Sequence, residues 1–318
     1  MWQATIVHRK SGRPVKGCSI VRPSGTWDKR LEATSVATAT FRVDCCTCVI
    51  EPRCHSLQWS FNGQPCWIGP ILQVFEEGGE VTVVARDATI FWETLLTADV
   101  AGGRDAAVMA AELDSLTSSC LVPALEPSGR TVQTTLEADS CQTVASHMAN
   151  LARRDIDWTV DAGVLLIAEN GTNFGDVQLT ETDFEGAPRV AKVGNRVSQV
   201  KAQGRDGLVA FYPNPAAPVG CEGDIRIPVS DPDTADIRDL ERTARAVYES
   251  RLPTIGVVGT PLKTSLKDPC ALVAGASVRI ATSSCLGDPV AGRLQLVRAT
   301  IQDGELESLS PTIEPATA

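Results

Sequence analysis

The sequence has only three histidines in 318 residues, and it has neither a long apolar run nor a block of basic residues. A Ser-His-Asp or Cys-His catalytic device would have to recruit His8, His55 or His147. No G-x-S-x-G elbow and no phosphate-binding P-loop is present either. The sequence therefore predicts a protein that is not an enzyme, with no catalytic residue.

The lack of long apolar runs also limits the relation to membranes. Runs such as residues 164–168 are far shorter than the roughly 20 residues that span a bilayer. Residues 1–17 lack the apolar core of a signal peptide. We therefore expect a soluble chain, made in a cytoplasm, that does not insert into a membrane.

The lack of a basic block argues against binding nucleic acid through its phosphates. The net charge is −10, whereas nucleic-acid-binding chains gather Lys and Arg on one face. We expect no sequence-specific nucleic-acid binding, although DNA could still pass through a pore lined by such a chain.

Cysteine is abundant, with 11 residues, and five of them lie close together in the sequence. Cys45, Cys46, Cys48, Cys54 and Cys66 accompany His55, and the spacing of Cys45 and Cys48 is compatible with zinc. Adjacent strand residues point to opposite faces, so Cys45 and Cys46 cannot both face one ion without a bulge. No second C-x-x-C follows. We predict no metal and no cofactor; free thiols, disulfides and a metal site stay open as states of this cluster.

The first 97 residues have the pattern of antiparallel strands. Asn62-Gly63 is the strongest short hairpin signal, because this pair accepts the positive φ angles of a type I′ turn. A second turn at Gly78-Gly79 leads into a strand in which Val81, Val83 and Ala85 alternate. Asp87 follows as the cap of a short apolar helix at residues 88–96.

Residues 98–187 change to a helical period. Asp105 is the predicted N-cap of a helix whose apolar residues share one face, and a second striped helix runs into a hairpin turning at residues 161–163. The sequence therefore predicts an α+β region here.

Residues 188–318 return to strands, with one long helix at about residues 234–251. Its apolar stripe is Ile237, Leu240, Ala244 and Val247, and Pro253 marks its end. Its outer face carries Arg238, Asp239, Glu241 and Arg242, and we expect this face to be solvated, although a partner subunit could use it. Asp303-Gly304 is a further hairpin turn.

The most compact group of carboxylates is Glu181, Asp183 and Glu185. Such a group could support glycoside hydrolysis. Acidic residues in a turn bounded by Gly and Pro are more often simply solvated, and a hydrolytic pair has no local spacing signature. We interpret these three as turn residues.

The segment 61–87 resembles a segment of minor tail proteins from long-tailed, non-contractile phages, especially phages of actinobacteria. There a strand carrying Trp-x-Gly-Pro precedes a turn and a strand that ends in Arg-Asp. The matching positions are Trp67, Gly69, Pro70, Ile71, Val81, Val83, Ala85, Arg86 and Asp87. The hairpin at residues 156–167, the segment 179–200 and the segment 261–284 also resemble these proteins.

These tail proteins are similar to the tail hub, or baseplate hub, of phages. The resemblance implies an α+β, β-dominated fold: a tube-type β-barrel or sandwich at residues 1–97, an α+β domain at 98–187 and a second barrel at 188–318. It leaves open which strands complete which barrel. It further implies a homotrimer, contacting the distal tail protein, the tape measure protein and the tip or fibre proteins, in which three subunits present six barrels and enclose the channel at the tail tip.

Two other functions stay open. A tail-associated peptidoglycan hydrolase would need a catalytic pair that the sequence does not display. A receptor-binding module would need an exposed aromatic patch, whereas the 6 Trp and 2 Tyr lie mostly in predicted strands. In the Trp67-x-Gly69-Pro70 segment, we expect Trp67 in the core, with the Gly-Pro pair as a kink; Arg86 and Asp87 are expected in a turn ion pair and a helix cap.

Overall fold

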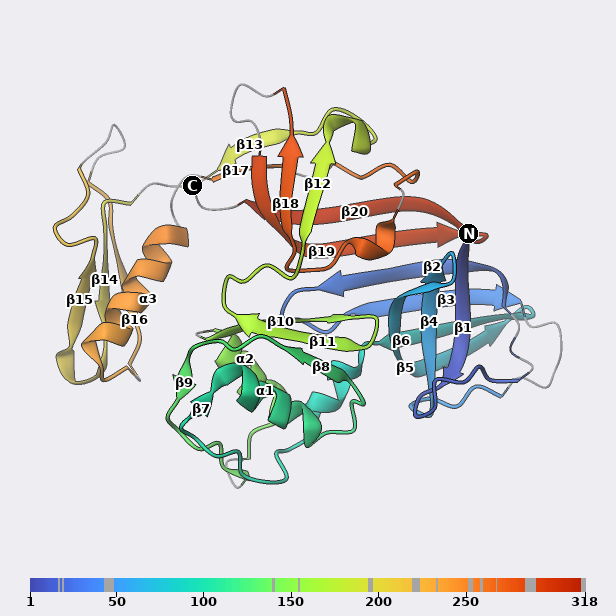
Figure 1. Ribbon diagram of the computed structural model, residues 1–318, viewed down its shortest axis with the longest axis horizontal. Coiled ribbons are helices and arrows are strands. Elements are labelled where there is room, and N and C mark those ends of the chain that lie inside the picture. The colour runs from blue at the N-terminus through green and yellow to red at the C-terminus, as the bar shows by residue number, and fades with distance from the viewer. Residues whose placement is uncertain are drawn as a thin grey trace.

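A computed structural model (Figure 1) describes the chain at residues 1–16, 18, 20–42, 49–138, 141–153, 155–193, 197–218, 224–232, 234–250, 254–257, 260–266, 268–283 and 290–315. Strands dominate, as the sequence predicted. The largest element is one sheet that draws its strands from both ends of the chain.

This sheet has the order β1-β4-β5-β6-β3-β2-β19-β18-β12, and β20 pairs with β19 off that path. Its strands are β1 (Trp2–His8), β2 (Val21–Arg30), β3 (Val36–Arg42), β4 (His55–Phe61), β5 (Gln64–Glu77), β6 (Glu80–Arg86), β12 (Asp176–Thr180), β18 (Ser277–Ala281), β19 (Val290–Gln302) and β20 (Glu305–Pro315).

The two ends of the chain meet where β2 pairs antiparallel with β19, from Leu296 opposite Arg30 to Ile301 opposite Gly25. Strand β12, which falls within residues 98–187, pairs in parallel with β18. The division into domains at residues 97 and 187, and the closing of each half into a barrel, stay predictions.

The predicted hairpin turns form as the local residues require. Asn62 and Gly63 have φ angles of 50° and 82°, and Asp303 and Gly304 have 52° and 79°, the positive values of a type I′ turn. Strand β6 buries Val81, Val83 and Ala85 on one face. The turn residues thus set the hairpins, and the alternation of apolar residues set the buried face.

The middle of the chain packs two helices on a small sheet below the large one in the view of Figure 1. Its elements are η1 (Ala88–Glu93), β7 (Arg104–Asp105), α1 (Ala106–Ser115), β8 (Val122–Leu125), β9 (Thr131–Val132), α2 (Val144–Ala152), β10 (Ile156–Asp161) and β11 (Val164–Glu169). Asp105 caps α1 by accepting from the Ala107 N–H, as predicted. The helix expected at residues 88–96 is shorter, a 3₁₀ turn that ends at Glu93.

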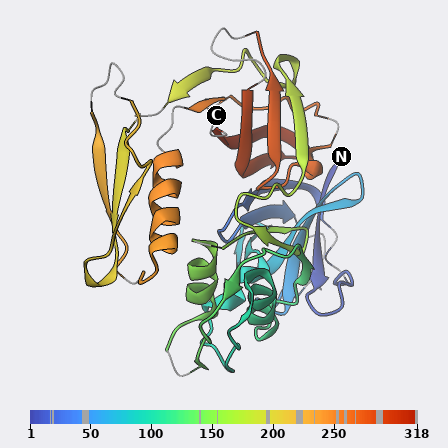
Figure 2. The same cartoon turned by 60° about the vertical axis from the view of Figure 1, so that its left-hand side comes forward.

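A second small unit, here called the α3 unit, covers residues 197–250. Helix α3 (Ile237–Ser250) packs on one face of the sheet β15-β14-β16, formed by β15 (Val209–Tyr212), β14 (Gln199–Gln203) and β16 (Arg226–Ser230). Figure 2 shows this unit standing apart from the large sheet. The remaining elements are η3 (Glu181–Asp183), β13 (Val190–Val193), η4 (Arg205–Gly207), β17 (Thr254–Val257) and η5 (Pro269–Ala271).

Candidate functional site

The Trp67-x-Gly69-Pro70 segment marks the place where strand β5 changes partner. Residues 64–70 of β5 pair with β4, and residues 71–77 pair with β6. Pro70 has no N–H to donate. A side chain at Gly69 would lie 2.0 Å from the carbonyl oxygen of Arg86, so only glycine fits. Trp67 is 2% exposed, which confirms its predicted place in the core.

The Arg-Asp pair after β6 also serves the fold. The Arg86 guanidinium lies 4.0 Å from the carboxylate of Glu93 at the surface. Asp87 is buried, and it accepts hydrogen bonds from the backbone N–H groups of Ser35 and Thr89. Burial raises the pKa of Asp87, and these hydrogen bonds oppose that shift. The pair is thus an ion pair and a cap, as predicted.

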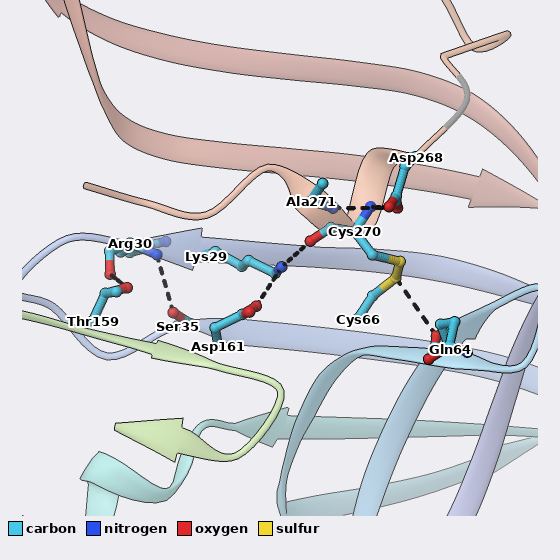
Figure 3. Close-up of polar contacts among 10 residues, drawn as sticks. All are labelled: Lys29, Arg30, Ser35, Gln64, Cys66, Thr159, Asp161, Asp268, Cys270 and Ala271. Carbon is cyan, nitrogen blue, oxygen red and sulfur yellow. Dashed lines mark hydrogen bonds and ion pairs between the residues drawn. A yellow bond between two sulfur atoms is a disulfide. The ribbon is translucent and has the colours of Figure 1, made fainter. Parts of the chain in front are cut away.

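A cluster of polar contacts and a disulfide lies where β2, β5, the β10–β11 turn and η5 meet (Figure 3). We call it the junction, and define it by Lys29, Cys66, Asp161 and Cys270. Lys29 is 1% exposed; its ammonium pairs with the Asp161 carboxylate at 2.6 Å and donates to the carbonyl of Cys270 at 3.0 Å. Cys66 and Cys270 form a disulfide.

These two partners offset the free-energy cost of burying the Lys29 ammonium. A lone ammonium in the interior is strongly unfavourable, so a buried Lys must have an anion and further acceptors. Here the anion comes from the middle of the chain and the second acceptor from near its end. The charge of Lys29 therefore links three segments that are far apart in the sequence.

Further contacts hold the β10–β11 hairpin on the large sheet. The Thr159 hydroxyl donates to the Arg30 carbonyl at 2.9 Å, and the Glu32 N–H donates to the Trp158 carbonyl at 2.9 Å. Two residues before Thr159 on the same strand, the buried carboxylate of Asp157 pairs with Arg293 of β19 at 2.5 Å. The hairpin is thus bound through both its backbone and its charges.

The three neighbouring carboxylates all lie at the surface, and two of them have structural partners. Asp183 accepts from the N–H and the hydroxyl of Thr180 and so caps η3. Glu181 accepts from Ser283, which lowers its pKa. Glu185 is exposed. A catalytic acid needs a raised pKa, and Glu181 shows the opposite.

A cavity of ≈ 450 Å³ lies beside η3, between β12 and the segment 263–272. Its charged side chains are Asp176, Asp183, Lys263 and Asp268. Two of these carboxylates cap backbone turns. Asp183 caps η3, and Asp268 accepts from the backbone N–H groups of Cys270 and Ala271 (Figure 3). Asp183 and Asp268 thus stabilise backbone turns at the wall of the cavity.

The cysteine and histidine cluster is only partly within the described residues, because Cys45, Cys46 and Cys48 lie outside them. Cys54 is an exposed free thiol, while Cys66 is committed to its disulfide. The Nδ1 atom of His55 accepts from the Glu51 N–H at 3.0 Å. A neutral ring then carries its proton on Nε2, which leaves no lone pair there for a metal.

Where the chain is described, no group of three or more His, Cys, Asp or Glu side chains could hold a metal ion. His8 packs edge-on against His55 at 4.8 Å between ring centroids. His147 is buried in α2, and burial lowers its pKa. The absence of metal and cofactor stays a prediction.

No described helix is long and apolar enough to cross a membrane.

The predicted stripe of α3 is largely confirmed. Leu240 and Ala244 are fully buried and Val247 is partly buried, whereas Ile237 is 40% exposed at the start of the helix. On the outer face, Arg242 pairs with Asp239 and Arg245 with Glu249. This face is solvated, as expected.

Sequence comparison does not classify the chain: no protein-family model matches it, and no curated protein matches it. Solved structures do match over the whole length. The 43 kDa tail protein of prophage MuSo2 from Shewanella oneidensis superposes with a TM-score of 0.68 at 10% identity, covering 98% of both chains. A tail protein from Neisseria meningitidis MC58 gives 0.64 at 15% identity, covering 98% of this chain and 96% of that one.

A third match is the c3393 protein of E. coli, a component of the type VI secretion system that is described as structurally similar to the T4 bacteriophage tail proteins gp27 and gp5. Its TM-score is 0.57 at 10% identity, covering 99% of this chain and 77% of that one. At such identities the likeness establishes the fold alone. The chain has the fold of phage tail and baseplate-hub-like proteins.

The junction could not be predicted from local patterns of residues. Lys29 lies in an ordinary-looking strand, and Cys270 is 204 residues from Cys66. The one available signal was a Lys with polar neighbours inside a strand, Asp28 and Arg30, and it does not say which distant residues will pair with it.

Proposed function

We propose that the chain is a structural hub protein at the tail tip of a siphovirus-like phage, of the actinobacterial type that the segment 61–87 resembles. It would form a homotrimeric ring that joins the sixfold tail tube to the threefold tip and encloses the channel for the tape measure protein and DNA. The observation that carries this proposal is the fold likeness to the MuSo2 tail protein over 98% of both chains.

Two strand edges support an assembly. Strand β8 is the last strand of its sheet, and Val122 and Leu125 on it are 64% and 41% exposed. Strand β12 is likewise the last strand of the large sheet. Exposed edges promote aggregation unless a partner covers them, and neighbouring subunits of a closed ring would do so.

The proposal includes no enzymatic activity, no cofactor and no sequence-specific nucleic-acid binding. What supports this is the structural use of Glu181 and Asp183 and the net charge of −10. The partners would be the distal tail protein, the tape measure protein and the tip or fibre proteins, with assembly in the cytoplasm of the bacterial host.

The test is the mass and shape of the purified protein, by light scattering and class-averaged electron micrographs, together with antibody labelling of isolated tails. A threefold ring with a central opening, and label on the axis of the tail tip, is the expected result. A stable monomer that is also absent from the tip axis would overturn the proposal.

Two assays separate the alternatives. Peptidoglycan release by the wild type, lost in Glu181→Gln and Asp183→Asn, would favour a hydrolase. Saturable binding of the isolated chain to host cells would favour a receptor-binding module. We expect neither.

A further inference from the structure

The Cys66–Cys270 disulfide joins strand β5 to the short helix η5, with 4.9 Å between the Cα atoms. This separation lies in the range of native disulfides. The two cysteines differ in exposure: Cys66 is fully buried, whereas Cys270 is half-buried. A small reagent in solvent therefore reaches Cys270 first.

Residue Cys270 is held a second time through its carbonyl, which accepts from Lys29 at 3.0 Å. The same ammonium pairs with Asp161 at the β10–β11 turn. The same turn packs closely against β5. A Cβ atom placed on Gly163, two residues after Asp161, would lie only 3.1 Å from Cγ2 of Ile68, two residues after Cys66. Disulfide, ion pair and turn thus form one contact network (Figure 3).

We propose that the Cys66–Cys270 pair is a redox latch for the docking of the β10–β11 hairpin. In the closed form, the disulfide holds η5 in place, so that the Cys270 carbonyl stays within reach of Lys29 and the ammonium stays directed at Asp161. In the open form, η5 is released, Lys29 loses one acceptor and the hairpin is held less firmly. The inference does not rest on the proposed function.

The chemistry is thiol–disulfide exchange with a low-molecular-weight thiol such as glutathione. Its thiolate attacks the sulfur of Cys270, and the bond to Cys66 breaks with Cys66 leaving as the thiolate. A second thiolate attacks the small-molecule sulfur of the mixed disulfide and releases Cys270. The protein disulfide is reduced to two thiols, two small thiols become one small disulfide, and their protons pass to the two cysteines.

Closing is the reverse reaction with a small disulfide as the oxidant. Cytoplasmic thiol pools keep such pairs reduced, whereas an extracellular medium oxidises them. The latch therefore opens and closes with the compartment in which the chain resides.

The first test compares the oxidised and the reduced full-length protein, with the double variant Cys66→Ser/Cys270→Ser treated alike as the control, because Cys18 is also disulfide-bonded and is reduced in the same buffers. After equilibration in glutathione buffers, we expect amide hydrogen exchange to accelerate severalfold at residues 156–169 and 268–272 in the reduced form, and to stay unchanged in α3. Equal exchange at residues 156–169 in both forms would overturn the latch.

The second test uses a matched pair of variants, incubated with glutathione disulfide and mapped by peptide mass spectrometry. Cys66→Ser should accumulate glutathione on Cys270, because the variant lacks the cysteine that pairs with Cys270 in the disulfide. In Cys270→Ser, the buried Cys66 should stay unmodified. Cys120→Ser, which removes an exposed free thiol, should leave the closing of the latch unchanged. Equal labelling of Cys66 and Cys270 in the two variants would refute the assigned order of attack.

Discussion

The large sheet and the α3 unit are both β-rich, but their cores differ greatly in size. The large sheet buries four tryptophans, Trp2, Trp27, Trp59 and Trp67, and it has a disulfide and a buried ion pair at its border. Among its described residues, the α3 unit has six buried apolar side chains, and three of them are alanines: Val197, Val200, Ala202, Ala210, Leu240 and Ala244.

Because burial of apolar surface is the main favourable term in folding, the large sheet should be the stable frame of the molecule. The α3 unit should open locally at a lower free energy, as units with few buried contacts do. Substitutions in the two regions can test this difference in stability.

The largest effects should come from removing one buried leucine in each region. Leu57 of β4 and Leu240 of α3 are both fully buried, and Leu→Ala in a core costs about 2–5 kcal/mol. Leu57→Ala should lower the free energy of global unfolding. Leu240→Ala should instead accelerate hydrogen exchange only within residues 197–250, without affecting the large sheet.

Denaturant unfolding together with hydrogen exchange distinguishes the two results. If Leu240→Ala accelerated exchange equally in β4 and α3, the two regions would be one cooperative unit and the contrast would be wrong.

The junction should respond asymmetrically to loss of either charge. Asp161→Asn leaves the buried ammonium of Lys29 without its anion, which costs about 3 kcal/mol or more. Lys29→Met leaves Asp161, whose side chain is 29% exposed and reachable by water, and leaves the Cys270 carbonyl without this donor, a cost of about 1–3 kcal/mol. Urea unfolding of both variants checks the order.

The double variant Lys29→Met/Asp161→Asn is the control, because it removes both charges. It should be more stable than Asp161→Asn alone. If Lys29→Met were the more damaging single change, the desolvation argument for the junction would fail.

Asp87 should make the stability of the large sheet depend on pH. Its pKa is raised by burial above the ordinary value of 3.8, so the folded state binds more protons than the unfolded state between these two values. Stability contributed by this group therefore falls as the pH rises from about 4 through the folded pKa. Asp87→Asn removes this pH-dependent contribution to stability, and it also weakens the helix cap at every pH.

The measurement is the difference in unfolding free energy between wild type and Asp87→Asn, followed from about pH 4 to pH 7. This difference should shrink with rising pH. A difference that grew with pH would mean that the hydrogen bonds from Ser35 and Thr89 outweigh burial.

The smallest effect should occur on the outer face of the α3 unit. Arg242 and Asp239 form an ion pair in which both side chains are more than half exposed, and such pairs contribute about 0.5 kcal/mol or less on a helix. Arg242→Ala should leave the unfolding midpoint within error. Arg245→Ala removes the ion pair with Glu249 and also the guanidinium over the Tyr212 ring, so it should cost more than Arg242→Ala. A large loss in Arg242→Ala would contradict the view that its ion pair is a weak surface pair.

Local features of the fold were predictable because their causes lie within a few residues. The caps Asp87 and Asp105, the turns at Asn62-Gly63 and Asp303-Gly304 and the stripe of α3 all depend on hydrogen bonds or spacing inside a short segment. The shortened helix after Asp87 shows the limit of this reasoning, since Trp92 and Leu96 pack into the helical core below the sheet and tertiary packing decided where the helix ends.

The alternating strands, the turns and the amphipathic helix were predictable from the sequence, because each follows from local chemistry. The pairing of β2 with β19, the disulfide between Cys66 and Cys270 and the ion pair of Lys29 with Asp161 became known only from the folded chain. These contacts join segments more than 100 residues apart, and any strand edge can satisfy the backbone of another. The choice of partner is therefore made by packing of the whole chain, where burying one charge requires its counterion to lie at the same place.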